Sequence, residues 1–319
     1  MKRQNYGMGL PLCLVLIASI FLWAGCYGSP SKEREAENIE VITTIFPLAD
    51  MVRRVGGDKV EVTNLLEAGD SPHTFEPTME QARQVARADL LFYVGKGLDD
   101  WAVSLGEEEG IYIVEVTDWL KEDQVLDYEP VHLENNEHEH HHCQHDHGPE
   151  DPHVWMDPIL VKEHLSPLIT ENLTMIKPEQ EDYFTGNLHQ FQGDLQELDR
   201  EIKEKVENFS QKEFITYHSA WNYYAHRYGL VEVAAVEEFP GREPSAKWLS
   251  ELVELAEEHG LGVIFAEPQL REENARVIAE EIDGEVLILD PLGGEDVPGR
   301  DSYLDLIRYN TEIFQQALE

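Results

Sequence analysis

Residues 214–236 read FITYHSAWNYYAHRYGLVEVAAV, and this stretch contains two different local patterns. The short apolar runs at 214–217 and 231–236 are typical of buried β-strands, and the segment near 220–227 leaves room for a helix between them. A strand, a helix and a strand in this order predict two parallel strands joined by a crossover helix. His218 directly follows the first of these strands, at the carboxyl end where open α/β folds bind ligands.

The same alternation of strand and helix patterns continues on both sides of this stretch. Further strands are predicted at 39–45, 60–66, 90–94, 111–116, 263–266 and 286–289. Helix signals separate them, such as the capping-box pattern that begins at Thr78 and the N-cap residue Ser245. Strands that alternate with helices form parallel sheets with helices on their faces, so the predicted fold class is α/β.

A long amphipathic segment divides the chain into two predicted lobes. Its apolar residues recur at steps of three and four, at Leu188, Phe191, Leu195, Leu198, Ile202 and Val206. This spacing predicts one apolar face of a long helix, which would span about 45 Å if it had about thirty residues. We therefore expect an N-terminal α/β lobe at 39–176, a linking helix at 177–208 and a C-terminal α/β lobe at 209–319.

The charge balance of the 319-residue chain excludes some classes of ligand. Lys and Arg number 24 against 64 Asp and Glu, which gives a formal net charge of −40. Such a chain offers no basic face to a phosphate backbone, so we expect no nucleic-acid partner. The charge favours cations as ligands, or simply a strongly solvated surface. The nucleotide-binding pattern G-x-x-x-x-G-K-[ST] does not occur in the sequence.

The N-terminus has the composition of an export signal. Lys2 and Arg3 precede an apolar stretch at 8–26, which ends in Ala24-Gly25-Cys26. This ending resembles the cleavage site of bacterial-type lipoproteins, in which the cysteine sulfur receives a lipid. We therefore expect a signal peptide at 1–25, lipidation at Cys26 and a lipid-anchored tether at 26–38. The alternative is an uncleaved membrane anchor, because the stretch is just long enough to span a bilayer. Either way, the lobes are expected outside the cytoplasm, at the membrane.

A His-rich loop is predicted at 132–150, within the N-terminal lobe. Seven of the 14 His of the chain lie here, interleaved with acidic residues. Such a composition cannot bury a core, so the segment is either a solvated linker or a site of loose metal capture, which we favour. The residues expected to capture metal are His138, His140, His141, His142, His145 and His147.

Three further His and one Asp lie where the chain is expected to be stiff. His73 and His153 each follow a Pro and have a second Pro a few residues downstream, which restricts the backbone around the imidazole. His218 and Asp290 each directly follow a predicted strand. We therefore predict a metal site, although each residue alone also suits a structural role, such as an Asp-Pro turn at Asp290.

The chain resembles the solute-binding lipoproteins of zinc and manganese ABC importers over about 39–319. The motifs that carry this resemblance are Pro72-His73 with Glu76-Pro77, Asp151-Pro152-His153-Val154-Trp155-Met156-Asp157-Pro158, Tyr217-His218-Ser219-Ala220-Trp221, Arg227-Tyr228-Gly229-Leu230, Glu243-Pro244-Ser245, Phe265-Ala266-Glu267-Pro268-Gln269 and Leu289-Asp290-Pro291. The resemblance implies a metal cleft between two α/β lobes, with the ligands His73 and His153 from the first lobe and His218 and Asp290 from the second. We also expect a monomer that serves a permease and an ATPase on other chains, because the sequence has no ATP-binding motif and no region with several membrane spans.

The donor set favours zinc over manganese. In the manganese-type relatives the third ligand is generally a carboxylate, whereas His218 stands at that position here. Zn²⁺ accepts a tetrahedral site rich in nitrogen, and Mn²⁺ prefers more oxygen donors. The expected function is therefore high-affinity zinc binding for import, with a manganese-binding importer component as one alternative.

A secreted zinc hydrolase is the alternative from a different class, because three His with an open fourth position resemble a catalytic zinc site. The helix motif H-E-x-x-H of many metalloproteases is missing from the sequence, so we expect no enzyme. Surface adhesion, which some relatives are thought to perform, is a third possibility for which no residue indicates a partner.

Overall fold

The computed structural model describes residues 38–107, 110–128, 150–237 and 241–319. The predicted signal peptide, Cys26, nearly all of the tether and the six metal-capturing His of the His-rich loop lie outside these residues. Within the described part of the chain, no helix combines the length and the apolar character needed to cross a bilayer.

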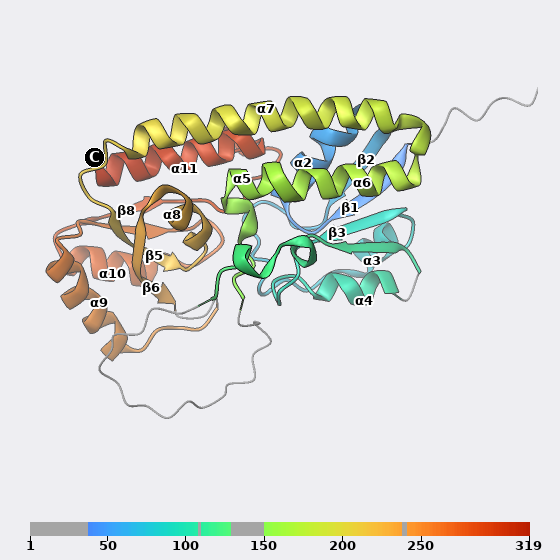
Figure 1. Ribbon diagram of the computed structural model, residues 1–319. Helices are drawn as coiled ribbons and strands as arrows, with labels where there is room; N and C mark the ends of the chain where they lie inside the picture. The colour runs from blue at the N-terminus through green and yellow to red at the C-terminus, as the bar shows by residue number, and fades with distance from the viewer. Residues whose placement is uncertain (1–37, 108–109, 129–149, 238–240) are drawn as a thin grey trace, which may run out of the picture. The chain divides into compact units, whose positions relative to one another are not determined.

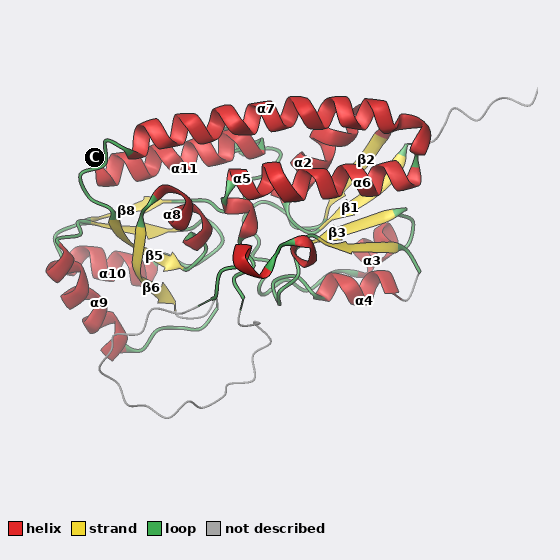
Figure 2. Cartoon of the chain, viewed as in Figure 1, coloured by secondary structure: helices red, strands yellow, loops and turns green. Residues whose placement is uncertain are grey.

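Two four-stranded parallel sheets form the framework, as the α/β prediction required (Figure 2). The strands of the first sheet are β1 (Ile39–Thr43), β2 (Val60–Asn64), β3 (Leu90–Tyr93) and β4 (Tyr112–Glu115), in the order β2-β1-β3-β4. The strands of the second sheet are β5 (Glu213–His218), β6 (Val231–Glu237), β7 (Val263–Ala266) and β8 (Glu285–Ile288), in the order β6-β5-β7-β8. The two sheets therefore share one topology, and we call them with their helices the first lobe and the second lobe.

Helices cover the sheets and fill the connections. Those of the first lobe are α2 (Phe46–Gly56), α3 (Met79–Val85), α4 (Trp101–Glu107), α5 (Pro158–Leu160) and α6 (Ser166–Ile176), with a π-helical turn at Val161–Leu165. Those of the second lobe are α8 (Asn222–Tyr228), α9 (Ala246–His259), α10 (Glu273–Glu281) and α11 (Tyr303–Leu318). Short 3₁₀ turns lie at Gly57–Lys59, Thr117–Trp119, Glu122–Gln124, Val154–Met156 and Pro178–Gln180.

One long helix, α7 (Glu181–Val206), connects the lobes. It is continuous over 26 residues, and its two glycines face open space. Figure 1 shows α7 running alongside α6 and α11, and α7 is in contact with each of these two helices. The predicted apolar face is buried, except that Leu188 is only partly covered.

The hydrophobic core is continuous between the lobes. A single cluster of buried apolar side chains includes Val41 and Phe92 from the first sheet, Leu198 from α7, and Phe214 and Phe314 from the second lobe. Burial of this kind contributes about 25 cal/mol per Å² of apolar surface, so separating the lobes along α7 would be costly. Any opening that admits a ligand is therefore expected on the side of the lobes away from α7.

An ion pair close to α7 also joins the lobes. Arg227 of α8 donates from Nε and Nη2 to Asp157 at 2.6–2.9 Å, and Asp157 also accepts from the backbone N–H of Ile159 at 2.8 Å. The Asp157 side chain is 4% exposed and that of Arg227 31%. The pair therefore neutralises a carboxylate that is shielded from water.

Arg227→Gln is expected to lower the free energy of unfolding by about 2–3 kcal/mol, because it leaves the Asp157 carboxylate buried without its cation. Urea denaturation measures this change. The control is Arg200→Gln, because Arg200 pairs with Glu197 and Glu204 on the exposed face of α7. Its cost should be about 0.5 kcal/mol or less, and equal losses in the two variants would contradict the prediction.

Candidate metal centre

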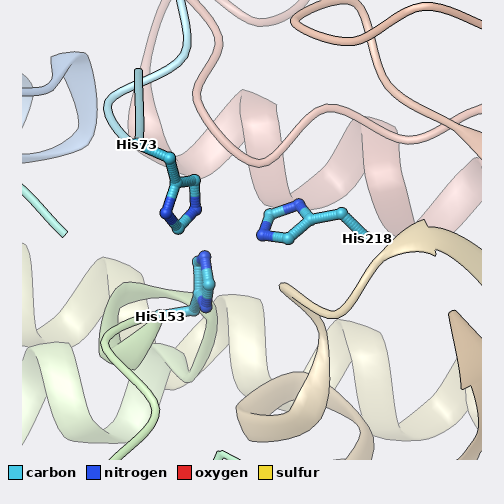
Figure 3. Close-up of side chains that lie close together, drawn as sticks. All are labelled: His73, His153 and His218. Atoms are coloured by element: carbon cyan, nitrogen blue, oxygen red, sulfur yellow. The ribbon is translucent and has the colours of Figure 1, made fainter. Parts of the chain in front are cut away.

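Three imidazoles converge from both lobes (Figure 3). One ring nitrogen from each of His73, His153 and His218 can be chosen so that all three lie within 4.8 Å of one another. The ring centroids are 5.6 Å apart for His73 and His153, and 5.0 Å apart for each of the other two pairs. Zn–N bonds are about 2.0–2.1 Å long, so two ligands of one ion lie at most about 4.2 Å apart. Nitrogens at the 4.8 Å limit would therefore move slightly closer together around a bound ion.

The local chain explains where each imidazole lies. His73 is in the loop before α3, where the indole N–H of Trp101 donates to the Pro72 carbonyl at 3.2 Å and so fixes the loop to α4. His153 directly precedes the 3₁₀ turn Val154–Met156. His218 is the last residue of β5 and lies at the carboxyl edge of the second sheet, where we expected it.

Two buried carboxylates orient two of the rings. His153 Nδ1 lies 2.7 Å from Asp151 Oδ1, and His218 Nδ1 lies 3.1 Å from Glu267 Oε1. An ionised carboxylate only accepts hydrogen bonds, so Nδ1 of each ring carries the proton and Nε2 keeps its lone pair. Carboxylates behind metal-binding imidazoles act in this way, and they raise the basicity of the ligand.

His218 has the environment of a cation ligand. Its side chain is buried, and in the described part of the chain no hydrogen-bond partner reaches its Nε2. Burial by itself lowers the pKa of His218, but the charge and hydrogen bond of Glu267, together with the charges of Glu232 and Asp151, raise it above its usual value. The same negative charges favour any cation placed at Nε2.

Asp290 lies outside the group of three imidazoles, and its carboxylate already has partners. Oδ1 accepts hydrogen bonds from Gln269 Nε2 at 2.8 Å and from the backbone N–H groups of Leu292 and Gly293. Oδ2 accepts from Arg300 Nη1 at 2.8 Å. The structure thus brings together three of the four predicted ligands. In this geometry Asp290 organises the Asp-Pro turn, and its role as a ligand stays a prediction.

The space between the imidazoles is very small. The cavity has a volume of about 10 Å³ and is lined by Ser71, Pro72, His73, His153, Trp155, His218, Glu267, Gln269, Leu270, Pro291 and Leu292. That volume corresponds to about one water-sized sphere. The site can therefore enclose a single ion, and it has no room for an organic substrate in this conformation.

Sequence reasoning gave no role to Asp151 and Glu267, although both lie in quoted motifs. The signal for Glu267 is topological, because it follows β7, the strand that pairs with β5 and its terminal His218. The signal for Asp151 is local, because a carboxylate two residues before His153 can reach back to both the backbone N–H and Nδ1 of that residue. The roles of Asp151 and Glu267 could be recognised only from the positions of the imidazoles in the structure.

Comparison with known proteins identifies the family of the chain. The family model described as zinc-uptake complex component A, periplasmic (ZnuA), matches residues 41–317. The chain belongs to the ZnuA family. In this family, the high-affinity zinc uptake system protein ZnuA of Bacillus subtilis is 29% identical to it over 326 residues, covering 96% of this chain and 97% of that protein.

Further relatives and solved structures extend the match. The zinc-binding lipoprotein AdcA of Streptococcus pneumoniae is 28% identical over 97% of this chain, which spans 61% of AdcA. A ZnuA crystal structure superposes with a TM-score of 0.76 at 25% identity, covering 89% of this chain and all of that one. The laminin-binding protein Lmb of Streptococcus agalactiae, described as bifunctional with adhesin and metal transporting activity, has a TM-score of 0.75 at 28% identity, covering 88% of this chain and all of that one.

Proposed function

We propose that this protein is the extracytoplasmic zinc-binding component of an ABC importer and that His73, His153 and His218 hold the ion. The observation that carries the proposal is the convergence of three imidazoles around a cavity of about 10 Å³. Carboxylates behind two of the rings leave Nε2 of each available to a cation. Membership of the ZnuA family supports zinc as the cargo.

The donor set supports zinc rather than manganese. Three nitrogen donors suit a tetrahedral Zn²⁺ site, and Mn²⁺ prefers oxygen donors and a higher coordination number. In this proposal the fourth position is filled by water, or by Asp290 after its carboxylate has left Arg300. Both arrangements keep the nitrogen-rich character of the site.

The test is a competition titration of metal-free protein with Zn²⁺ and Mn²⁺, together with elemental analysis of the stoichiometry. One tightly bound zinc that excess manganese does not displace is the expected result. Deleting 132–147 should remove weakly bound metal and leave this one ion, because we propose that the His-rich loop only collects zinc. Tighter binding of manganese would overturn the assignment.

The hydrolase alternative receives no support from the cavities. The space at the imidazoles has no room for a peptide or an ester. A larger cavity of about 410 Å³ extends from Phe46 to Gly293 and Gly294, but no imidazole lines it. We therefore propose a binding protein rather than an enzyme, and zinc-dependent turnover in a screen of peptides and esters would contradict this.

The remaining parts of the import system belong to other chains in this proposal. We propose that the protein is a monomer tethered to the membrane, through a lipid on Cys26 or through its signal segment, and that it passes zinc to a separate permease and ATPase. The lipoprotein AdcA among its relatives supports the tether. Release then requires the His73 loop, the 151–157 segment and the end of β5 to move apart.

Glu267→Gln is expected to weaken zinc binding by about tenfold, because carboxylates behind metal-binding imidazoles typically contribute about 10–100-fold to affinity. The measurement is competition with a chelating dye. Glu237→Gln is the matched control, since Glu237 is also a buried carboxylate of the second lobe but bonds to Tyr217 and Gly241. If both variants lost affinity equally, the hydrogen bond to His218 would not be the cause.

A further inference from the structure

The segment 151–157 belongs to the first lobe in sequence, but its contacts run to the second. Tyr223 of α8 donates from its hydroxyl to the Asp151 carbonyl at 3.1 Å, and the indole N–H of Trp155 donates to the Pro291 carbonyl at 2.8 Å. Tyr303 of α11 donates to the Trp155 carbonyl at 2.7 Å. Together with the Arg227–Asp157 ion pair, these bonds hold the residues on both sides of His153 against the second lobe.

Asn222, the first residue of α8, occupies the central position in this contact. Its amide Nδ2 lies 3.0 Å from Asp151 Oδ2 and 3.2 Å from Ser219 Oγ. An amide group has two N–H donors, so one group can make both bonds. One bond reaches the first lobe, and the other reaches the residue that follows His218.

The bonds on either side of Asn222 lead to two of the imidazoles. Asp151 accepts from Asn222 with Oδ2 and faces His153 Nδ1 with Oδ1, so the carboxylate connects the amide to that ring. On the other side, Ser219 donates to Glu232 Oε2 at 2.6 Å. The Thr216 hydroxyl also faces Glu232, and its single proton is shared between Glu232 Oε1 and the His218 carbonyl, which lies 2.9 Å from Thr216 Oγ1. These contacts hold the backbone at His218 on both sides, through Thr216 before it and Ser219 after it.

We infer that Asn222 is a positioning residue, which joins His153 and His218 into one hydrogen-bonded unit across the lobe boundary. The inference rests on the proposed function for its effect on zinc, and on geometry alone for the link between the imidazoles. Asn222 slows zinc release because it holds the imidazoles of His153 and His218 at fixed positions relative to each other.

The test compares Asn222→Ala and Asn222→Asp with the full-length protein, loaded with zinc and mixed with excess chelator. Removing a group behind a metal ligand typically costs about 10–100-fold in affinity, and we expect zinc to dissociate about tenfold faster from both variants. Asn222→Asp keeps the shape of the side chain but presents an oxygen to Asp151 in place of the N–H donor. If zinc dissociated from this variant at the wild-type rate, Asn222 would act only through packing, and the inference would be overturned. Cobalt-loaded Asn222→Ala should also show shifted visible absorption bands, because the arrangement of the ligands changes.

Asn187→Ala is the matched control. Asn187 is half-buried like Asn222, and it bridges α7 and α2 by donating to the Val55 carbonyl at 2.9 Å. Its loss should lower the melting temperature but change zinc release by less than twofold. Equal acceleration in this control, or wild-type release from Asn222→Ala, would overturn the inference.

A measurement without metal separates this inference from the proposed function. In metal-free protein, the NMR signal of the His153 Nδ1 proton should exchange faster with water in Asn222→Ala, because Asp151 loses its anchor. An unchanged signal would contradict the positioning role even if the wild type binds zinc. A wild type that binds no zinc but shows the altered proton signal would contradict only the proposed function.

Discussion

Replacing His218 by alanine is expected to lower zinc affinity by about a hundred- to a thousandfold. Structural zinc sites bind with about 10–16 kcal/mol at neutral pH, so one of four ligands contributes on the order of 3 kcal/mol, and each 1.4 kcal/mol is a factor of ten. The substitution also leaves Glu267 buried without the imidazole that faces it. This second effect lowers the stability of the fold rather than the affinity for zinc, so the loss of affinity comes from the missing ligand.

The measurement is isothermal titration of metal-free protein, or competition with a chelator where binding is too tight. His259→Ala is the matched control, because His259 also faces a carboxylate, with its Nδ1 2.9 Å from Glu213 Oε2, but lies outside the imidazole group. This control should bind zinc like the wild type. A change below about threefold in His218→Ala would remove His218 from the ligand set.

Saturating zinc is expected to raise the melting temperature by about 7 °C. A ligand that binds only the folded state stabilises it by about 4 kcal/mol at a free concentration a thousandfold above Kd. The unfolding entropy is about 2.1 cal/mol/K per residue, so for a folded unit of about 280 residues each kcal/mol shifts the melting temperature by about 1.7 °C. His73 and His153 come from one lobe and His218 from the other, so unfolding of either lobe destroys the site.

Differential scanning calorimetry with added zinc, and again with EDTA, measures this shift. Manganese at the same concentration is the chemical control, and it should raise the melting temperature much less. His218→Ala is the protein control, which should lose most of the zinc-dependent shift. A shift of equal size in that variant would mean that zinc stabilises the protein from another place.

Much of the fold was predicted from local patterns in the sequence. Apolar runs located the strands at 39–45 and 90–94 within a few residues, because buried parallel strands need continuous apolar sequence. The amphipathic spacing predicted α7 for a similar reason, since one face of a helix that covers both lobes must be apolar. His218 was predicted as a ligand because it follows a strand, and ligands gather at that edge of a parallel sheet.

Partnerships between distant residues were not visible in these patterns. Asp290 directly follows a strand as His218 does, but its carboxylate is occupied by Arg300 and Gln269, and no spacing in the sequence predicts those bonds. Glu267 and Asn222 likewise acquire their roles from neighbours about fifty and seventy positions away. A hydrogen bond depends on distances of about 3 Å, which only the packed chain fixes.

The amino-acid sequence by itself determined the two parallel sheets, the long helix between them and the three imidazoles at stiff points of the backbone, because each depends on residues close together in the chain. The tertiary structure alone decided that these imidazoles share one small cavity, that carboxylates orient two of them, and that Asp290 lies outside the group. The reason is physical. Apolar periodicity and proline stiffness act over a few residues, whereas the partners of a buried polar group are set by the packing of both lobes together.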